Sequence, residues 1–402
     1  MLGEKLGHSF SPMIHGYLGE YNYSLFEVSS GDLDSFMTER RFDGINVTIP
    51  YKQAVMPYCA AISKEAQTIG SVNTIVKDDK GALHGHNTDY HGFGVMLEHG
   101  GIDPKGKKTL VLGDGGSAKA VRAALEGLGA REIVTISRRG ENHYGNIERH
   151  YDADIIVNTT PVGMYPDNGN SPLRLTGFTR LTGVADLIYN PTRTRFLLEA
   201  EKLGVPCVNG LVMLVAQAEK ASRLFLAGPA RPELVNKIHG EILKRTRNIA
   251  LIGMPGCGKS TVGRHLAEKT GRPFIDIDAQ IEAAAGKKIP QIFSEDGEET
   301  FRQLETRVLA EEAKKSGMVL ATGGGVVTRP ENLDLLRQNC LIVYLKRELT
   351  ELITDGRPLS QNVGIQALAE KRLPLYEAWS DSVVRVEAKP ELTAARIEEV
   401  IQ

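Results

Sequence analysis

A glycine-rich loop that ends in a lysine and a serine carries the most specific chemistry in this sequence. Residues 253–260 read GMPGCGKS, which matches G-x-x-x-x-G-K-[ST] between an apolar run and a helical segment. The backbone N–H groups of such a loop point into one concavity, and the following helix N-terminus adds positive potential, so polyphosphate binds there. We expect Lys259 to reach the terminal phosphates and Ser260 to bind Mg²⁺. The alternative, a glycine-rich turn without a ligand, does not account for the strand–loop–helix context.

Carboxylate and guanidinium groups after this loop could complete a site for phosphate transfer. Asp276 and Asp278, in the run FIDID, are expected to end a strand, where alternation puts both on one face. One could bind hydrated Mg²⁺ while the other accepts a hydrogen bond from a substrate hydroxyl; a solvated strand-end pair is the alternative. Arg302, Arg357 and Arg372 could clamp a carboxylate and the transferring phosphate. Each arginine alone is more often a solvated surface residue.

A second glycine turn indicates a dinucleotide site. Residues 110–118 read LVLGDGGSA, that is, strand, tight turn and helix, a variant of the fingerprint whose helix N-terminus binds pyrophosphate. The next strand ends in TISRR. An acid there would bind the ribose 2′-hydroxyl of NAD, whereas Arg138 and Arg139 suit the 2′-phosphate of NADP. NADP is therefore favoured over a basic loop without a ligand.

Three polar clusters stand upstream of this turn: HSFSP at 8–12, NVTIPYK at 46–52 and GHNTD at 85–89. Reduction of a carbonyl group needs a proton donor near the developing alkoxide, and a lysine with an aspartate partner can supply it. Lys52 and Asp89 are the candidates. For either residue alone, a solvated charge is the alternative.

The elements that must position these residues alternate along the whole chain. Apolar, β-branched runs and segments of helical period follow one another, which predicts α/β architecture with mainly parallel sheets. The expected strands are 43–49, 72–77, 108–113, 131–137, 154–158, 183–187, 205–208, 247–253, 273–277, 317–322, 341–345 and 383–386. The expected helices are 89–99, 116–128, 193–203, 211–226, 231–245, 259–270, 296–316, 331–338, 365–379 and 391–401.

The best domain boundary lies near residue 246, where a polar helical run leads into the fresh strand NIALIGM. We expect residues 1–245 to combine a substrate subdomain (about 1–100 and 220–245) with a Rossmann-like NADP subdomain (about 101–219). Residues 247–402 should form a P-loop domain, a parallel sheet flanked by helices.

Composition excludes several other classes of protein. The formal net charge of −2 offers no global attraction to nucleic acid or to an anionic membrane. No apolar run approaches the roughly 18 residues that span a bilayer, and the N-terminus lacks the apolar stretch of a signal peptide. Four cysteines lie far apart, which favours reduced thiols over disulfides or zinc: Cys59, Cys207, Cys257 and Cys340. We expect a cytoplasmic enzyme of small molecules.

The second half resembles a known family. GMPGCGKST, FIDIDAQIE, FRQLE, ATGGGVV, GRPLS and RLPLYEAW are similar to shikimate kinase over 247–402. The resemblance implies that Asp276 supports the metal with Ser260, that Asp278 holds the hydroxyls of shikimate and assists deprotonation, and that Arg357 belongs to a closing lid. It implies an ATP-binding loop of Gly253, Gly256, Cys257, Gly258, Lys259, Ser260 and Thr261. It implies a shikimate site of Asp278, Arg302, Gly323, Gly324, Gly325 and Arg372.

The first half resembles another family. GEKLGHSFSPMIH, NVTIPYK, SVNTI, GHNTDYHG, LGDGGSA, NTTPVGM, IYNPTRT and GLVMLVAQA, in this order, are similar to shikimate dehydrogenase over residues 1–245. The resemblance implies that Lys52 donates the proton and that Asp89 orients the substrate and shares acid–base work. It implies substrate contacts by Ser9, Ser11, Thr48, Asn73, Asp89 and Gln217. It implies NADPH contacts by Gly113, Gly115, Gly116, Ser117, Ser137, Arg138 and Arg139, with Asn158, Thr159, Tyr189 and Met213 around the nicotinamide.

The two resemblances imply consecutive reactions of aromatic amino-acid synthesis. The first half would reduce 3-dehydroshikimate to shikimate with NADPH, and the second would phosphorylate shikimate with MgATP. Two alternatives stay open. The first half could prefer quinate or NAD, or one half could bind a nucleotide without catalysing a reaction.

Overall fold

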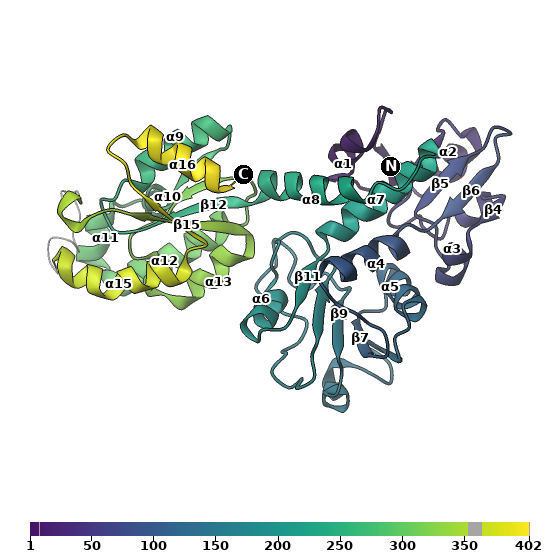
Figure 1. The fold of residues 1–402 in the computed structure, drawn as a ribbon, viewed down its shortest axis with the longest axis horizontal. Coiled ribbons are helices and arrows are strands. Elements are labelled where there is room, and N and C mark those ends of the chain that lie inside the picture. Colours follow the sequence, from purple (N-terminus) through teal and green to yellow (C-terminus); the bar gives the residue numbers. More distant parts are fainter. Residues whose placement is uncertain (8, 353–363, 402) are drawn as a thin grey trace. The chain divides into compact units, whose positions relative to one another are not determined.

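The computed structural model describes residues 1–7, 9–352 and 364–401 of the 402-residue chain. The chain divides into two compact units (Figure 1). Unit 1 comprises Met1–Tyr189 and Thr194–Glu241, and unit 2 comprises Asn190–Arg193 and Ile242–Gln402. Both units have α/β architecture, which confirms the predicted fold class. The division falls within helix α8 (Pro232–Thr246), whereas the sequence placed the boundary just after this helix.

The first part of unit 1 is built on a four-stranded sheet of order β3-β5-β6-β4. β5 pairs antiparallel with β3 and with β6, and the turn at 78–82 joins β5 directly to β6. β4 pairs parallel with β6. β1 and β2 form a separate parallel pair. The strands are β1 (Leu2–Gly3), β2 (Phe26–Glu27), β3 (Gly44–Asn46), β4 (Ala61–Ile62), β5 (Thr74–Lys77) and β6 (Leu83–His86). The helices are α1 (Ser11–Leu18), α2 (Leu33–Glu39) and α3 (Lys64–Ile69), with a 3₁₀ turn at Met56–Tyr58.

The second part of unit 1 is a parallel five-stranded sheet of order β11-β10-β9-β7-β8. The strand order reverses beside β7, and right-handed crossovers place α5 and α6 on opposite faces. β7 is buried along its whole length, as a strand covered on both faces must be. The strands are β7 (Lys108–Leu112), β8 (Glu132–Ile136), β9 (Ile155–Asn158), β10 (Gly183–Asp186) and β11 (Cys207–Asn209). The helices are α4 (Asp89–His99), α5 (Gly116–Gly127), α6 (Arg195–Lys202) and α7 (Leu211–Leu226), with a 3₁₀ segment at Tyr144–His150.

Unit 2 contains a parallel five-stranded sheet of order β13-β14-β12-β15-β16 around one apolar core. α9 and α16 lie together on one side of the sheet, and α12, α13 and α15 lie on the other (Figure 1). The strands are β12 (Asn248–Ile252), β13 (Phe274–Asp276), β14 (Val319–Ala321), β15 (Cys340–Lys346) and β16 (Ser382–Arg385). The helices are α9 (Lys259–Thr270), α10 (Ile277–Ala285), α11 (Ile289–Glu295), α12 (Gly297–Glu312), α13 (Pro330–Asn339), α15 (Ile365–Trp379) and α16 (Pro390–Ile401). Short 3₁₀ turns lie at Val326–Thr328 and Leu349–Glu351.

No helix within the described ranges combines the length and the apolar character that a bilayer span requires.

Candidate active sites

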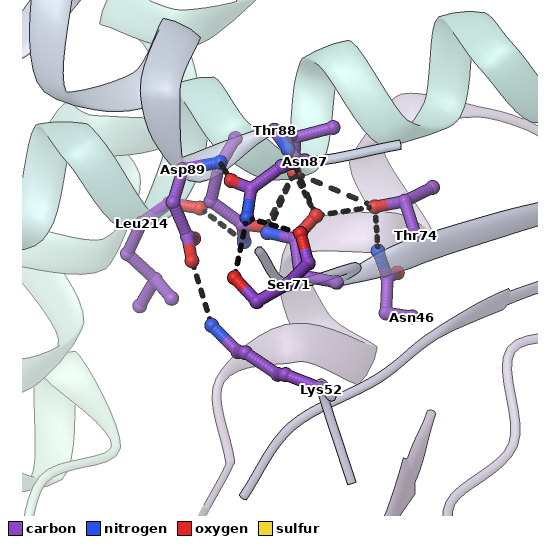
Figure 2. Close-up of polar contacts among 10 residues, drawn as sticks. Asn46, Lys52, Ser71, Thr74, Asn87, Thr88, Asp89 and Leu214 are labelled. Carbon is purple, nitrogen blue, oxygen red and sulfur yellow. Dashed lines mark hydrogen bonds and ion pairs between the residues drawn. The ribbon is translucent and has the colours of Figure 1, made fainter. Parts of the chain in front are cut away.

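A lysine and an aspartate meet in a cavity of unit 1. Lys52 Nζ lies 2.6 Å from Asp89 Oδ2 (Figure 2), and the side chains are 24% and 15% exposed. Lys52 stands in the turn after β3, where its carbonyl oxygen accepts a hydrogen bond from Val72 N at 2.8 Å. Asp89 begins α4, and its backbone N donates to Asn87 Oδ1 at 3.1 Å. Two separately anchored backbone segments therefore hold the ammonium and the carboxylate together.

Polar side chains behind this pair form a continuous hydrogen-bonded group. Asn73 Oδ1 accepts from Thr88 N at 2.8 Å, and Asn73 Nδ2 donates to Thr88 Oγ1 at 3.1 Å. The Thr88 hydroxyl lies 3.3 Å from Gln217 Oε1, and Gln217 Nε2 donates to the Leu214 carbonyl oxygen (Figure 2). Because an amide has one donating and one accepting end, these contacts define how Asn73 and Gln217 face the cavity.

The cavity measures about 330 Å³ and brings together most residues that the sequence assigned to substrate and nicotinamide. α7 reaches it because α4 has a glycine at the crossing: a Cβ at Gly92 would lie 2.8 Å from the Met213 carbonyl oxygen. Asn46 also lines the cavity, although the sequence analysis did not select it. The predicted residues that line it are Ser9, Ser11, Thr48, Lys52, Asn73, Asp89, Ser117, Tyr189, Met213 and Gln217.

The glycine turn after β7 leaves the backbone at the start of α5 uncovered by side chains. Gly113 has φ +103°, and a Cβ there would lie 2.8 Å from Thr159 Oγ1, so only glycine suits this position. A Cβ at Gly115 or Gly116 would meet no atom within 4 Å. The turn therefore offers free space at the N-terminus of a 12-residue helix, where an anion is favoured.

Two arginines follow the neighbouring strand β8. The Ser137 side chain hydrogen-bonds to the Arg139 carbonyl oxygen, and Ser137 is buried while Arg138 and Arg139 are exposed. Their guanidinium groups thus stand in solvent at the carboxyl end of the sheet. This end is where a dinucleotide ribose lies in such folds.

Asn158 and Thr159 hold the end of β9 and are not among the residues that line the cavity. Asn158 is fully buried, and its Nδ2 donates to Asp186 Oδ1 at 3.0 Å. Thr159 Oγ1 donates to the Leu112 carbonyl oxygen at 2.6 Å. Burial raises the pKa of Asp186 to about 7, against the opposing effect of hydrogen bonds from Thr194, a backbone N–H and Asn158. These contacts join the ends of β7, β9 and β10 below the nucleotide turn.

The P-loop of unit 2 connects β12 to α9. Gly256 and Gly258 have φ +82° and +99°, and a Cβ at Gly253 would lie 2.7 Å from the Leu345 carbonyl oxygen. Lys259 is 7% exposed, and its Nζ donates to the carbonyl oxygens of Gly253 and Met254 at 2.9 and 3.0 Å. An ammonium group therefore lies within the loop at a helix N-terminus, next to Ser260 and Thr261 in the first turn of α9.

The predicted arrangement of the two aspartates was wrong. β13 ends at Asp276, and Asp278 lies in the first turn of α10, so strand alternation does not relate them. Asp276 instead caps the helix, since its Oδ1 accepts from Asp278 N at 3.1 Å and Ala279 N at 3.4 Å. The chain turns into a helix at Asp276 instead of extending the strand, because the Asp276 side chain satisfies backbone N–H donors that the helix leaves unpaired.

Two buried arginines converge on the glycine turn after β14. A Cβ at Gly325 would lie 2.0 Å from Arg302 Nη1, and Arg372 Nη1 donates to the Gly324 carbonyl oxygen at 3.1 Å. Arg302 and Arg372 are 5% and 4% exposed. A Cβ at Gly323 would meet Asp278 Oδ1 at 2.9 Å. The absence of side chains on the turn is what lets these groups gather there.

The same turn abuts the phosphate loop. A Cβ at Gly324 would lie 2.6 Å from Pro255 Cγ, and Tyr376 Oη hydrogen-bonds to the Gly324 carbonyl oxygen. The guanidinium cluster and the phosphate loop are therefore neighbours within unit 2. An acceptor bound at the arginines would lie beside a nucleotide bound in the loop.

The geometry of unit 2 does not test two predictions, the role of Arg357 and the Mg²⁺ site. Arg357 lies outside the described residues. Within the described ranges, no group of three or more His, Cys, Asp or Glu side chains is placed to hold a metal ion. Mg²⁺ needs no such group in a nucleotide site, since it keeps waters and binds phosphates with one or two protein oxygens.

Comparison with known proteins identifies both units. A curated shikimate dehydrogenase (NADP(+)) of Clostridium perfringens (strain SM101 / Type A) is 38% identical over 246 residues, which are 56% of this chain and 90% of the relative. The chain belongs to the shikimate dehydrogenase family. The family model for the shikimate dehydrogenase substrate binding domain matches residues 1–75. The family model for shikimate kinase matches residues 255–402. The chain therefore carries a kinase domain in unit 2 in addition to the dehydrogenase in unit 1.

Solved structures agree with the assignment of unit 1. A chorismate mutase/shikimate 5-dehydrogenase fusion protein from Clostridium acetobutylicum has a TM-score of 0.57 and 37% identity, covering 60% of this chain and 95% of that one. Shikimate 5-dehydrogenase from Thermus thermophilus, in complex with NADP(H) and shikimate, has a TM-score of 0.55 and 33% identity, covering 60% and 97%. The chain thus combines oxidoreductase and kinase domains that act on shikimate-related molecules.

The turn after β7 in unit 1 fits NADPH, and the P-loop of unit 2 fits ATP, each on its own observation. Open backbone at Gly115 and Gly116 suits a pyrophosphate, and the buried ammonium of Lys259 suits the phosphates of ATP. Asp186 and Glu305 are two buried acids behind these sites that were not predicted from the sequence. An acid at the end of an apolar strand was the available signal for Asp186, and the run FRQLE contained Glu305 without indicating its role.

Proposed function

We propose that unit 1 reduces 3-dehydroshikimate to shikimate with NADPH and that unit 2 phosphorylates shikimate with MgATP to shikimate 3-phosphate. The first half of the proposal rests on the 2.6 Å pair of Lys52 and Asp89 in a cavity lined by hydroxyls and amides. The second half rests on Arg302 and Arg372, buried at a glycine turn beside the phosphate loop.

In the dehydrogenase cavity, a lysine is placed to complete a carbonyl reduction. Bound NADPH supplies the hydride that converts the carbonyl carbon to an alcohol carbon. The Lys52 ammonium donates a proton to the carbonyl oxygen as negative charge develops there. Asp89 holds this ammonium in place and accepts a hydrogen bond from a neighbouring ring hydroxyl. The Ser9 and Ser11 hydroxyls then bind the substrate carboxylate at the other end of the ring.

Recognition of NADPH rather than NADH is assigned to the end of β8. Arg138 and Arg139 are exposed there, and the strand ends without an acid that would pair with a free 2′-hydroxyl. The positive charge of the arginines complements a 2′-phosphate. NADP is also the cofactor in the name of the Clostridium perfringens relative.

In the kinase unit, the acceptor and the donor are held by different elements. Arg302 and Arg372 bind the shikimate carboxylate, and Asp278 accepts the hydrogen of the reacting hydroxyl. ATP supplies the phosphoryl group, and Lys259 neutralises charge on its terminal phosphates. Ser260 and Asp276 are the proposed oxygen ligands of Mg²⁺ and its waters.

Separate assays of purified, intact chain test the proposal. Loss of NADPH absorbance with 3-dehydroshikimate and formation of ADP with shikimate and MgATP are the expected results. Coupled conversion of 3-dehydroshikimate to shikimate 3-phosphate should stop when either nucleotide is omitted. Parallel assays with quinate and with NADH decide the alternative specificity. Nucleotide binding without turnover in one unit would contradict the proposal for that unit.

A further inference from the structure

A groove over helix α4 of unit 1 is separate from the dehydrogenase cavity. It measures about 940 Å³, against about 330 Å³ for the cavity, and within the described ranges no residue lines both. α4 forms its floor, α5 and α7 pack on either side of α4 (Figure 1), and the start of α3 adds to the wall. Asn87 and Thr88 line the groove, whereas the next residue, Asp89, lines the cavity. A groove of this size can hold a small organic molecule of its own.

A glycine in the floor keeps the groove open. Gly94 lies in the middle of α4, where glycine destabilises a helix relative to alanine, and a Cβ there would meet no atom within 4 Å. Two other glycines nearby have a packing reason. A Cβ at Gly92 would lie 2.8 Å from the Met213 carbonyl oxygen, and a Cβ at Gly127 of α5 would overlap Tyr90 Oη. Helix packing therefore does not account for Gly94, whose missing side chain leaves space in the groove.

Apolar side chains from α4, α5, α7 and the loop after α4 make up much of the lining. Leu128 is 40% exposed at the rim, an unusual position for a large apolar side chain near an open groove. Covering such a surface removes apolar area from water on both sides of the contact, so the groove favours a ligand with an apolar body. The apolar lining residues include Val95, Leu97, Ile102, Ala124, Leu128 and Leu224.

Three half-buried polar side chains in the same groove can donate hydrogen bonds. Within the described ranges, the side chains of His86, His91 and Lys220 form no hydrogen bond and no ion pair with other side chains. Burial lowers the pKa of both histidines, and the positive charge of Lys220 adds to this effect. The imidazoles are therefore neutral near neutral pH and carry one N–H each. The Lys220 ammonium thus differs from that of Lys52, which Asp89 already pairs.

Acidic side chains also line the groove, but they stand in solvent. Water and salt screen exposed charges, whereas a half-buried ammonium keeps more of its field. The pKa of Glu65 is lowered first by a hydrogen bond from its own backbone N–H, and then by groups that include Ser63 and Lys220. The polar groups that are least solvated are therefore donors, and they complement a single negative charge. The exposed acids are Glu65, Glu98 and Asp103.

We propose that this groove is a second ligand site of unit 1, which takes a monocarboxylate with an apolar body. Its carboxylate binds the Lys220 ammonium, and its apolar body covers Gly94 and Leu128. The dehydrogenase cavity is of another kind, because hydroxyls and amides line it. Binding in the groove does not depend on the reactions proposed for either unit.

Three ligands of one shape test the charge that the groove recognises. Biphenyl-4-carboxylate, biphenyl-4-methanol and biphenyl-4-methylamine are titrated into the full-length chain by calorimetry, with NADP⁺ and ADP present to fill the nucleotide sites. We expect the acid to bind at least about tenfold more tightly than the alcohol, and the amine to bind most weakly. Equal affinities of acid and alcohol, or tightest binding of the amine, would overturn the proposal.

Decanoate, titrated in parallel, distinguishes an aliphatic from an aromatic body. The tighter of the two acids gives the class of ligand, since both offer one carboxylate and differ in the shape of the apolar part. Failure of both acids to bind at millimolar concentration would overturn the proposal.

Lys220→Met tests the carboxylate contact, because it keeps the length of the side chain and removes its charge. The dissociation constant of the acid should rise about tenfold, while that of the alcohol stays within about twofold. Lys237→Met is the matched control, since Lys237 is exposed on α8 and does not line the groove. It should leave both constants unchanged. An unchanged affinity of Lys220→Met for the acid would place the carboxylate elsewhere and overturn the proposal.

Gly94→Leu tests the position of the apolar body by filling the floor of the groove. Binding of the acid and of the alcohol should both weaken at least about tenfold, whereas Gly94→Ala should bind the acid within about threefold of the unmodified chain. Thermal midpoints check that both variants are folded. If Gly94→Leu does not fold, Leu128→Asp at the exposed rim replaces it and should weaken binding of the acid more than that of the alcohol. Full affinity for the acid in the folded variant would overturn the proposal.

Discussion

Arg302 Nη1 lies 2.7 Å from Glu305 Oε2, and the side chains are 7% and 0% exposed. Both residues are on α12, three positions apart, with the glycine turn of the kinase unit against them. Burial raises the pKa of Glu305, while the nearby Arg302 opposes this shift. Glu305 therefore fixes a guanidinium group that we assign to the shikimate carboxylate.

Glu305→Gln should weaken shikimate binding by the kinase. The substitution keeps the shape of the side chain but replaces a charge-assisted hydrogen bond to Arg302, so the guanidinium loses its fixed geometry. We expect the KM for shikimate to rise about tenfold, with a smaller change in kcat, in an assay of ADP formation.

Glu298→Gln is the matched control for this prediction. Glu298 Oε1 also pairs with Arg302, at 3.2 Å, but its side chain is 53% exposed. An exposed pair contributes little, so the KM should change less than about twofold. Equal effects of the two substitutions would contradict a special role for Glu305.

Lys52→Ala should abolish most of the dehydrogenase turnover. Removal of the proton donor from its 2.6 Å contact with Asp89 should lower kcat about 10²- to 10⁴-fold, measured as NADPH consumption with 3-dehydroshikimate. Kinase turnover should be unchanged, and Lys259→Ala should give the reverse result. Trp379, the single tryptophan, reports folding of unit 2 by fluorescence. Loss of both activities in folded Lys52→Ala protein would show that the two sites are not independent.

Strands and helices with a clear period were predictable from sequence, whereas short or overlapping elements were not. The helix 89–99 that begins at Asp89 was predicted at its observed bounds. β1, β2 and β4 are two residues long and depend on distant partners, so no local period exposes them. The run FIDID alternates like a strand, yet its last two residues begin helix α10. The helical spacing of Ile277 and Ile281 and the cap at Asp276 favour the helix there.

The residue types that line the dehydrogenase cavity could be predicted from the sequence, but the contacts between these residues could not. Lys52 and Asp89 come from separate motifs, and only the packing of α4 behind the turn after β3 brings them within 2.6 Å.

Replacing Arg138 and Arg139 by alanine should change cofactor preference. Both guanidinium groups are exposed at the end of β8, where they would neutralise a 2′-phosphate. We expect the KM for NADPH to rise roughly 10- to 100-fold while the KM for NADH changes less than about twofold. Arg131→Ala, at the opposite end of β8 and 53% exposed, is the control and should leave both values unchanged. A parallel rise in both KM values would assign the arginines to another part of the cofactor.

Asp186 should make the stability of unit 1 fall as the pH rises. Burial raises the pKa of Asp186 from 3.8 to about 7 in the folded chain. Between these values the unfolded carboxyl binds fewer protons than the folded one, so the free energy of unfolding decreases with pH, by up to about 1.4 kcal/mol per unit. Above the folded pKa the contribution of this group stays constant at its least favourable level.

Asp186→Asn should remove this dependence, because an amide does not titrate. The thermal midpoint of unit 1, followed as residual dehydrogenase activity after heating, should fall less between pH 5 and 8 in the variant than in the unmodified chain. Asp152→Asn is the control: its carboxyl is 53% exposed and its pKa is lowered by Lys108, so it is ionised throughout this range. That variant should keep the original pH dependence, and an Asp186→Asn variant that also keeps it would show that Asp186 is already ionised at pH 5.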